Sequence, residues 1–378
     1  MPNTMPPARA KTRRVRKHLL KPKCRVKKTD IPLGSDYTGL DPGIMILKKL
    51  GLQDRARPMY GSDSAAYVRA FLKNNYKYEN GLFKSIQSRP PMKPNVITFY
   101  AAGFECQPFS LMGLQQGEKD KSGRGLGALE VTIKIAEERP EIFVLENVRA
   151  FATMQKHKEL FHKMMADLRK LRDHIGKPQY HIEHKVLNTK DYGIPHSRRR
   201  VYIIGFKVSS QVAPFSWPRP TPPRPTASEF LDKDDPKLVR QRVFPTAFRA
   251  LERLTSGLKI LKKKKIDFKR RTIFIDIDGG PKRPVDYKEG VCMCLTRNRC
   301  AASGWWVSNR MRRMTTQEML KFQGIQLPSE AYHNVEGLTR RQFQMMIGNS
   351  WSLNVASKIT YHLFLATGVA TKQQMRAP

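Results

Sequence analysis

Short apolar runs alternate with helical periodicity between residues 35 and 206, and this alternation constrains the fold more than any other feature. The strand-like runs are rich in β-branched and aromatic residues and cover residues 96–102, 142–145 and 201–204. Helical patterns cover residues 126–138 and 158–172. Continuous apolar strands separated by helices are typical of a sheet that is buried on both faces. The pattern predicts an α/β fold with a parallel, doubly wound, Rossmann-like sheet.

Composition divides the chain into four parts. Residues 1–30 are rich in Lys, Arg and Pro, which predicts a disordered basic arm. Residues 31–210 hold the alternating pattern. Six prolines between Pro214 and Pro225 indicate an extended linker, which opens a small basic region over residues 211–290. Residues 291–378 return to a compact pattern and close with a helix over 354–367, so we expect them to rejoin the first domain.

The net charge restricts the class of partner. Seventy Lys and Arg against 32 Asp and Glu leave a formal charge of +38. The first thirty residues hold eleven of the basic residues and one acid, so the rest of the chain still carries about +28. Such an excess favours a polyanionic partner, most commonly nucleic acid, over an anionic membrane surface. No apolar run approaches the roughly 18 residues of a membrane span, so no membrane partner is expected. The sequence does not identify protein partners.

The cysteines indicate the compartment. They are five in number and irregularly spaced, which excludes a disulfide framework and predicts a reducing environment. The N-terminus lacks the apolar region of a signal peptide, so an intracellular protein is expected. The basic arm fits a nuclear-localisation signal, a DNA-contacting arm or an organelle transit peptide; a prokaryotic chain would be cytoplasmic. Cys292, Cys294 and Cys300 offer three sulfurs without a nearby histidine, so no metal site is expected.

Ionisable side chains follow the predicted strands, where a doubly wound sheet binds its ligands. Cys106 lies in the loop after residue 102, where a thiol is exposed for nucleophilic attack, although lone cysteines are more often small buried hydrophobes. Glu146 ends the next strand and can serve as a proton donor or base, or merely cap a helix. Arg198 and Arg200 alternate on a strand and therefore share a face, which either points into the cleft or forms a solvated edge.

Taken together, these segments resemble the cytosine-5 DNA methyltransferase family. Five motifs stand in the family's order between residues 35 and 367: the nucleophile loop over residues 103–110, the tripeptide Glu146-Asn147-Val148, the arginine pair, and two C-terminal segments. The first of those segments is Gln323-Gly324, preceded by Arg313-Met314-Thr315 and Glu318, and the second is residues 348–352 with Val355. The resemblance implies S-adenosylmethionine as the cofactor and a flipped cytosine in DNA as the substrate.

The resemblance also assigns roles to domains and residues. Residues 31–210 would be the catalytic domain that binds the cofactor, 211–290 a linker and target-recognition domain, and 291–378 the rest of the catalytic domain. The catalytic residues would be Cys106, Glu146, Arg198 and Arg200. The cofactor-binding residues would be Tyr37, Thr38, Gly39, Leu40, Asp63, Asn349, Ser350 and Ser352. The nucleic-acid-binding residues would be Gln107, Ser110, Lys262, Lys263, Lys264, Lys265, Arg270 and Arg271.

Three positions depart from the family's pattern. Glu105 stands where the family has proline, and its charge is expected to raise the pKa of the Cys106 thiol. His196 replaces a glutamine, and Asp41 stands where a second glycine is usual. Two alternatives therefore remain open. One is a tRNA cytosine-5 methyltransferase, which shares the fold and the cysteine chemistry. The other is a non-catalytic relative that only binds nucleic acid.

Overall fold

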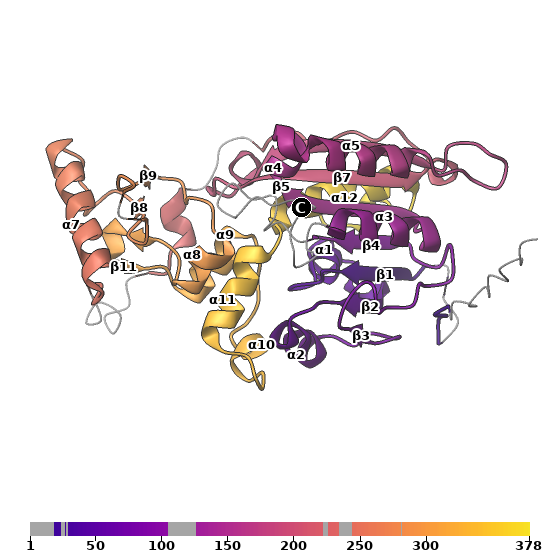
Figure 1. The fold of residues 1–378 in the computed structure, drawn as a ribbon, viewed down its shortest axis with the longest axis horizontal. Coiled ribbons are helices and arrows are strands. Elements are labelled where there is room, and N and C mark those ends of the chain that lie inside the picture. The colour runs from indigo at the N-terminus through magenta and orange to yellow at the C-terminus, as the bar shows by residue number, and fades with distance from the viewer. Residues whose placement is uncertain are drawn as a thin grey trace, which may run out of the picture.

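A seven-stranded sheet in the order β3-β2-β1-β4-β5-β7-β6 forms the larger part of the molecule (Figure 1). The computed structural model describes residues 19–23, 27, 29–104, 126–221, 226–233, 244–280 and 282–378. The strands are β1 (Ile31–Asp36), β2 (Ala56–Ser62), β3 (Leu82–Phe83), β4 (Phe99–Ala102), β5 (Ile142–Val148), β6 (Tyr180–Asn188) and β7 (Arg199–Lys207). Strands β1 to β5 pair in parallel, whereas β7 runs antiparallel to both β5 and β6.

The predicted doubly wound α/β fold is confirmed, with one correction. The strand expected at residues 201–204 is β7, and it is antiparallel rather than parallel. A parallel crossover needs a dozen or more residues, usually with a helix, whereas only residues 189–198 join β6 to β7. The two strands therefore form an antiparallel pair. Strand β6 escaped prediction because its sequence mixes His, Glu and Lys with apolar residues, and several of them are exposed.

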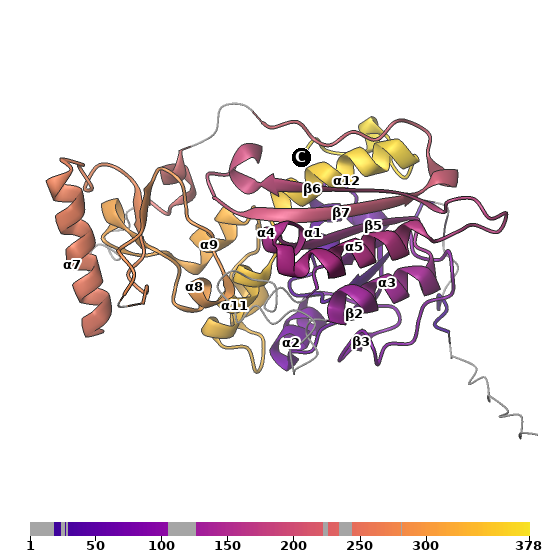
Figure 2. The same cartoon turned by 45° about the horizontal axis from the view of Figure 1, so that its top comes forward.

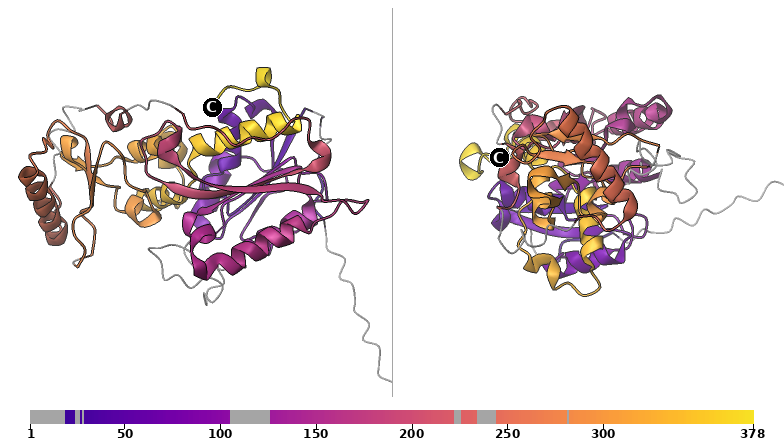
Figure 3. Two further views of the ribbon diagram at one scale, coloured as in Figure 1. Left: turned by 90° about the horizontal axis from the view of Figure 1, so that it is seen from above. Right: turned by 90° about the vertical axis from the view of Figure 1, so that its left-hand side faces the viewer.

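Helices cover both faces of the sheet (Figures 2 and 3). Helices α1 (Pro42–Lys49) and α12 (Leu353–Thr367) pack together on one face, and α3 (Gly127–Glu138) and α5 (Gln155–Arg169) on the other. Alternate strand residues supply the two cores: Phe99 and Ile204 face α12, while Tyr100 and Phe143 face α3 and α5. The C-terminal helix thus returns to the first domain, as the closing pattern over 354–367 predicts. No helix in the described residues is long and apolar enough to cross a membrane.

A smaller unit extends from one end of the large sheet (Figure 1). Its sheet has the order β11-β10-β8-β9, built from β8 (Ile273–Ile275), β9 (Tyr287–Glu289), β10 (Trp306–Val307) and β11 (Arg312–Arg313). Helix α7 (Phe248–Lys263) packs on it through Leu254 and Leu261. The sheet pairing draws residues 306–313 into this unit, beyond the boundary expected at residue 290.

The described residues form six further α-helices, and three of them, α8, α9 and α11, lie between the two units (Figure 1). They are α2 (Ala66–Asn75), α4 (Arg149–Thr153), α8 (Arg297–Ala301), α9 (Thr316–Phe322), α10 (Glu330–His333) and α11 (Arg340–Asn349). Helix α8, which lies between β9 and β10 in the sequence, packs closely on α11, so the small unit contacts the segment that follows it.

Candidate active site

A cavity of about 310 Å³ lies where the parallel strands end. Tyr37 and Asp63 follow β1 and β2, Phe104 follows β4, and Glu146 belongs to the end of β5. Because β7 is antiparallel, its amino end lies at this same edge, so Arg198 and Arg200 join the cavity from the opposite chain direction. Tyr37, Gly39 and Asp63 are called the acidic wall below, and Glu146, Arg198 and Arg200 the arginine wall.

The acidic wall is shaped by backbone conformation. Tyr37, Gly39 and Asp41 all have left-handed φ angles, of 54°, 55° and 57°. The buried Thr38 hydroxyl donates to the carbonyls of Ser35 and Ser62 and accepts from the Ser62 N–H, which ties the loop to β2. The Gly39 N–H donates to Asp63 Oδ2 at 3.0 Å. Left-handed and right-handed or extended residues thus alternate along residues 37–41, and this bends the chain around one end of the cavity. Glycine is the residue that adopts a positive φ without strain.

The conformation and contacts of Asp41 account for an aspartate at a position where the family usually has glycine. Its φ is left-handed, which is why glycine suits the position, but Asp is among the residues that tolerate this conformation. Its Oδ1 accepts from the Ile44 N–H at 3.0 Å and caps α1, and its Oδ2 accepts from the Tyr78 hydroxyl at 2.5 Å. Complete burial raises the pKa of Asp41 to about 6, against the lowering effect of these hydrogen bonds.

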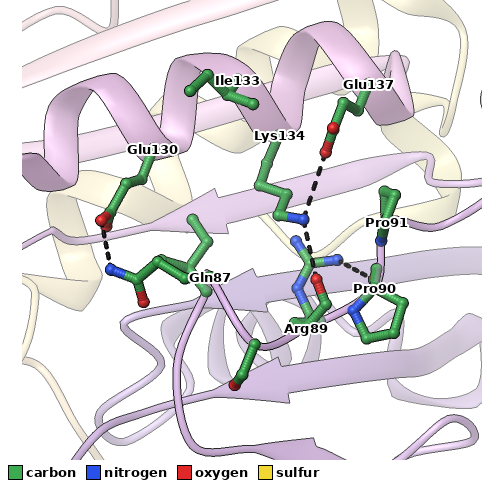
Figure 4. Close-up of a pocket in the computed structure, with 10 residues that line it drawn as sticks. Gln87, Arg89, Pro90, Pro91, Glu130, Ile133, Lys134 and Glu137 are labelled. Atoms are coloured by element: carbon green, nitrogen blue, oxygen red, sulfur yellow. Dashed lines mark hydrogen bonds and ion pairs between the residues drawn. The ribbon is translucent and has the colours of Figure 1, made fainter. Parts of the chain in front are cut away.

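Asp63 and Tyr37 present the polar groups of the acidic wall. Burial raises the pKa of the Asp63 carboxyl, although the N–H groups of Ala65 and Gly39 donate to it. The Tyr37 hydroxyl donates to Glu130 Oε2 at 2.5 Å, and Gln87 donates to the other oxygen of Glu130. A second cavity, of about 410 Å³, lies between α3 and residues 86–91 with Glu130 at one end (Figure 4). Tyr37 is therefore held from outside the active site.

Glu146 and Arg200 form the ionic centre of the arginine wall. Both side chains are largely buried, with exposed fractions of 11% for Arg200 and 8% for Glu146, and Arg200 Nε lies 3.0 Å from Glu146 Oε1. The pair is close but poorly aligned, so Oε1 has no hydrogen-bond donor among the described residues. Burial raises the pKa of the Glu146 carboxyl, and Arg200 and Arg198 oppose that rise. Glu146 can therefore either carry a proton or accept a hydrogen bond from a substrate.

Arg198 holds three separate segments together. Its Nη1 donates to the Leu295 carbonyl at 2.7 Å, and its Nη2 donates to Ser350 O at 2.6 Å and Gly348 O at 3.3 Å. The side chain is only 2% exposed. Since both terminal nitrogens bind backbone carbonyls, Arg198 positions the C-terminal motif around the cavity. The catalytic role that the family resemblance implies for Arg198 stays a prediction.

His196 does the same for the segment leading into β7. The fully buried ring accepts from the Leu295 N–H at 3.1 Å through Nε2, which assigns the proton to Nδ1, 2.9 Å from the Phe322 carbonyl. Burial and the neighbouring Arg198 lower the pKa of His196 well below its ordinary value, so the ring is neutral. A neutral imidazole donates one hydrogen bond and accepts another, as the glutamine amide of the family can.

The C-terminal motif closes the cavity from above the strand ends. Leu40, Asn349 and Ser350 line a narrow pocket that adjoins the cavity, together with Trp351. A Cβ on Gly103 would lie 2.5 Å from Trp351 Nε1, so glycine is required where the nucleophile loop leaves β4. Ser352 lies elsewhere: it is fully buried and bonds Thr189, which fits a packing role at the start of α12.

Four expected residues of the nucleophile loop, Glu105, Cys106, Gln107 and Ser110, lie outside the described residues. The six basic residues expected to bind nucleic acid are described, and all six are exposed at the end of α7 and in the turn before β8. Arg271 pairs with Glu289 at 3.1 Å, and Lys264 lies 5.4 Å from the ring centroid of Tyr287. None of the expected residues Lys262, Lys263, Lys264, Lys265, Arg270 and Arg271 lines the cavity.

Sequence reasoning missed three residues that the structure brings to the site. Arg297 lines the cavity from the first turn of α8, Trp351 abuts Gly103, and Glu130 anchors Tyr37. No local pattern marks Arg297, which stands in a basic stretch after two cysteines. Trp351 falls inside the C-terminal motif and was open to prediction. Glu130 is one of three acids in its helix, and only the fold places it beside Tyr37.

Comparison with known proteins agrees with this geometry. A profile described as C-5 cytosine-specific DNA methylase matches residues 47–364. The Type II methyltransferase M.HaeII of Haemophilus aegyptius is 29% identical over 276 residues, 73% of this chain and 76% of the relative. The Type II methyltransferase M.NgoBI of Neisseria gonorrhoeae is 30% identical over 254 residues, 67% of this chain and 70% of the relative.

Solved structures with low sequence identity share the fold. The methyltransferase EhMeth of Entamoeba histolytica has a TM-score of 0.59 at 18% identity and covers 89% of this chain and 98% of its own. The S. pombe Dnmt2 methyltransferase has a TM-score of 0.55 at 15% identity, with the same coverage. The family profile spans more than half of the sequence and takes in the segments that form the arginine wall and the closing motif. This chain belongs to the C-5 cytosine-specific DNA methylase family.

Proposed function

We propose that this protein is a DNA (cytosine-5)-methyltransferase that uses S-adenosylmethionine and attacks the base through Cys106. The observation that carries the proposal is the meeting of Glu146 and Arg200 with the acidic wall in one cavity. That cavity offers one region suited to a nucleotide-like cofactor and another suited to a polar base. The nucleophile loop leaves β4 at Gly103, on the rim of the same cavity.

The acidic wall fits the cofactor. Gly39 leaves open space because it has no side chain, and the Asp63 carboxylate follows the neighbouring strand, where an acid suits ribose hydroxyls. Tyr37, Gly39, Asp63, Leu40, Asn349 and Ser350 would hold it, with Thr38 shaping the loop behind them. When bound, S-adenosylmethionine supplies an electrophilic methyl group.

The arginine wall would activate the base. Cytosine carbon 5 is a poor nucleophile, so the Cys106 thiolate adds to carbon 6, and the electron pair of the 5,6 double bond becomes available at carbon 5. Glu146 donates a proton or hydrogen bond to ring nitrogen 3, for which its raised pKa is suited. Arg200 holds Glu146 and faces the base oxygen. Carbon 5 takes the methyl group, and loss of its proton expels the thiolate and restores the double bond.

The target base must leave the helical stack to enter a cavity of this depth, so we include base flipping in the proposal. The exposed lysines and arginines at the end of α7 would contact phosphates and orient the nucleic acid without reading its sequence. The small unit would then be the target-recognition domain.

The test is transfer of labelled methyl from S-adenosylmethionine to duplex DNA, with tRNA as a parallel substrate. We expect label in DNA, none with Cys106→Ala, and about 10²- to 10⁴-fold slower transfer with Glu146→Gln. Glu159→Gln, which removes an exposed acid from α5, is the matched control and should retain full activity. Methyl label in tRNA but not in DNA would show that tRNA, and not DNA, is the substrate. DNA binding without any transfer would favour the non-catalytic alternative.

A further inference from the structure

We propose that Arg297 is an anion-binding residue of the reaction cavity, and that it takes a phosphate oxygen beside the flipped nucleotide. This inference rests on the proposed function, because it supposes that a nucleotide enters the cavity. It adds a third arginine to the pair that the sequence motif identifies, and it gives that arginine a different task.

Arg297 is fixed to the cavity through its backbone. It begins α8, whose capping Thr296 side chain accepts from the Arg299 N–H. A Cβ on Gly348 would lie 2.5 Å from Arg297 N, so α8 and the end of α11 are packed backbone to backbone. The Arg297 side chain therefore starts from a rigid position and lines the cavity with Asp63, Tyr67 and Met346.

The side chain has no partner among the residues that the structure describes. Its Nε is buried and makes no hydrogen bond, and no ion pair joins it to Asp63 on the same cavity surface. Asp63 instead accepts from the N–H groups of Gly39 and Ala65. The two terminal nitrogens make no hydrogen bond to the described residues either, and they are not buried, so an anionic oxygen that enters the cavity can pair with the guanidinium.

The neighbouring arginines are all occupied. Arg198 donates to three backbone carbonyls, and Arg200 pairs with Glu146. Arg299, two residues further along α8, pairs with Asp276 at 2.6 Å and lies 4.7 Å from the ring centroid of Trp305. Those three arginines already bind groups that stabilise the fold or position Glu146. Arg297 is therefore the arginine of this group that can bind an anion entering the cavity.

Two anionic groups would reach this cavity in the proposed reaction: the phosphodiester of the target nucleotide and the carboxylate of the cofactor's amino-acid part. The shared chemistry is an oxyanion that accepts from a guanidinium. Partial exposure of Arg297 and its origin between the two units favour the phosphate, because nucleic acid would approach from that side. The two sources can be told apart, because loss of a phosphate contact weakens DNA binding and loss of a carboxylate contact weakens cofactor binding.

The experiment compares wild type, Arg297→Gln and Arg297→Lys in three assays on the full chain: S-adenosylmethionine binding by calorimetry, duplex DNA binding as a function of salt, and methyl transfer. Arg341→Gln, an exposed arginine at the start of α11, is the matched control. For Arg297→Gln we expect DNA affinity to fall about tenfold and the slope of log affinity against log salt to drop by roughly 0.9, with unchanged cofactor affinity. Arg297→Lys should restore the slope.

A fall in cofactor affinity with an unchanged salt slope would assign the same oxyanion site to the carboxylate. Wild-type values in both binding assays for a folded Arg297→Gln protein would overturn the proposal. Since Arg297 makes no contact that stabilises the described fold, its variants should melt as wild type does. Absence of methyl transfer by wild type would count against the proposed function alone, because the two binding assays do not require turnover.

Discussion

The acidic wall and the arginine wall face each other across one cavity but are held by different means. Main-chain geometry shapes the acidic wall: left-handed residues and N–H groups that point at a carboxylate. Side chains that reach across the molecule hold the arginine wall, with Arg198 gripping carbonyls about 100 and 150 residues away. The first wall takes its shape mainly from the main-chain conformation of residues 37–41, whereas the second depends on side chains that reach across the completed fold. Substitutions should therefore damage the two walls in different ways.

The largest effect is expected from Arg198→Met, which removes the donors to three buried carbonyls while keeping side-chain volume. We expect the free energy of unfolding to fall by about 2–5 kcal/mol, because buried acceptors lose their partners, together with loss of methyl transfer. Denaturant unfolding and the transfer assay measure the two effects. Arg199→Met is the matched control, since Arg199 is exposed on the opposite side of the strand. Equal stability of the two variants would show that the hydrogen bonds of Arg198 to the three carbonyls do not stabilise the fold.

Gly39→Ala tests the acidic wall. A left-handed alanine costs about 1–2 kcal/mol, and distortion of the loop should also weaken S-adenosylmethionine binding by about tenfold. Gly81 is a suitable control, because its φ of +98° is also positive and no atom lies within 4 Å of an added Cβ. Gly81→Ala should be similarly destabilised yet bind the cofactor normally. If both variants lose cofactor affinity equally, the effect is on global stability and not on the wall.

His196 gives the arginine wall a pH dependence. Its folded-state pKa is lowered, so below about pH 6.5 the unfolded chain binds a proton that the folded chain does not. The stability of wild type should therefore fall as the pH drops below that value and stay level above it. His196→Gln should keep the fold at neutral pH and lose this part of the slope. Urea titrations between pH 5 and 8 provide the measurement, and an unchanged slope in the variant would exclude His196 as its source.

Asp41→Asn should have the smallest effect and the opposite pH sign. Because the folded pKa of Asp41 is raised to about 6 from 3.8, the folded state binds the extra proton between those values. The Asp41 contribution to stability therefore improves as the pH falls through 6. Asparagine caps a helix about as well and also tolerates the left-handed conformation. The variant should gain a little stability at pH 8 relative to wild type and lose that advantage near pH 4, as thermal melts at the two values would reveal.

Local patterns predicted the kind of sheet, strands β4, β5 and β7 and helices α3, α5 and α12, because periodicity is a property of adjacent residues. The antiparallel direction of β7 was not predictable in this way, since it follows from the short segment that joins it to β6. Glu146 and Asp63 were correctly located at strand ends. The hold of Arg198 on the C-terminal motif could not be predicted, because the carbonyls that it binds come from residues 295, 348 and 350. Long-range partners leave no mark in a local pattern.

The ties from Arg198 also have a consequence for the order of synthesis. A chain emerging from the ribosome completes β7 about 140 residues before Gly348 and Ser350 exist. During that interval the small unit can form and Arg198 Nη1 can already bind the Leu295 carbonyl, but Nη2, which later binds the carbonyls of residues 348 and 350, has only water to bind. The cavity is therefore assembled last, after the C-terminal helix has returned to the sheet. Any nascent chain that stops short of α12 carries the chemical groups of the site without the site itself.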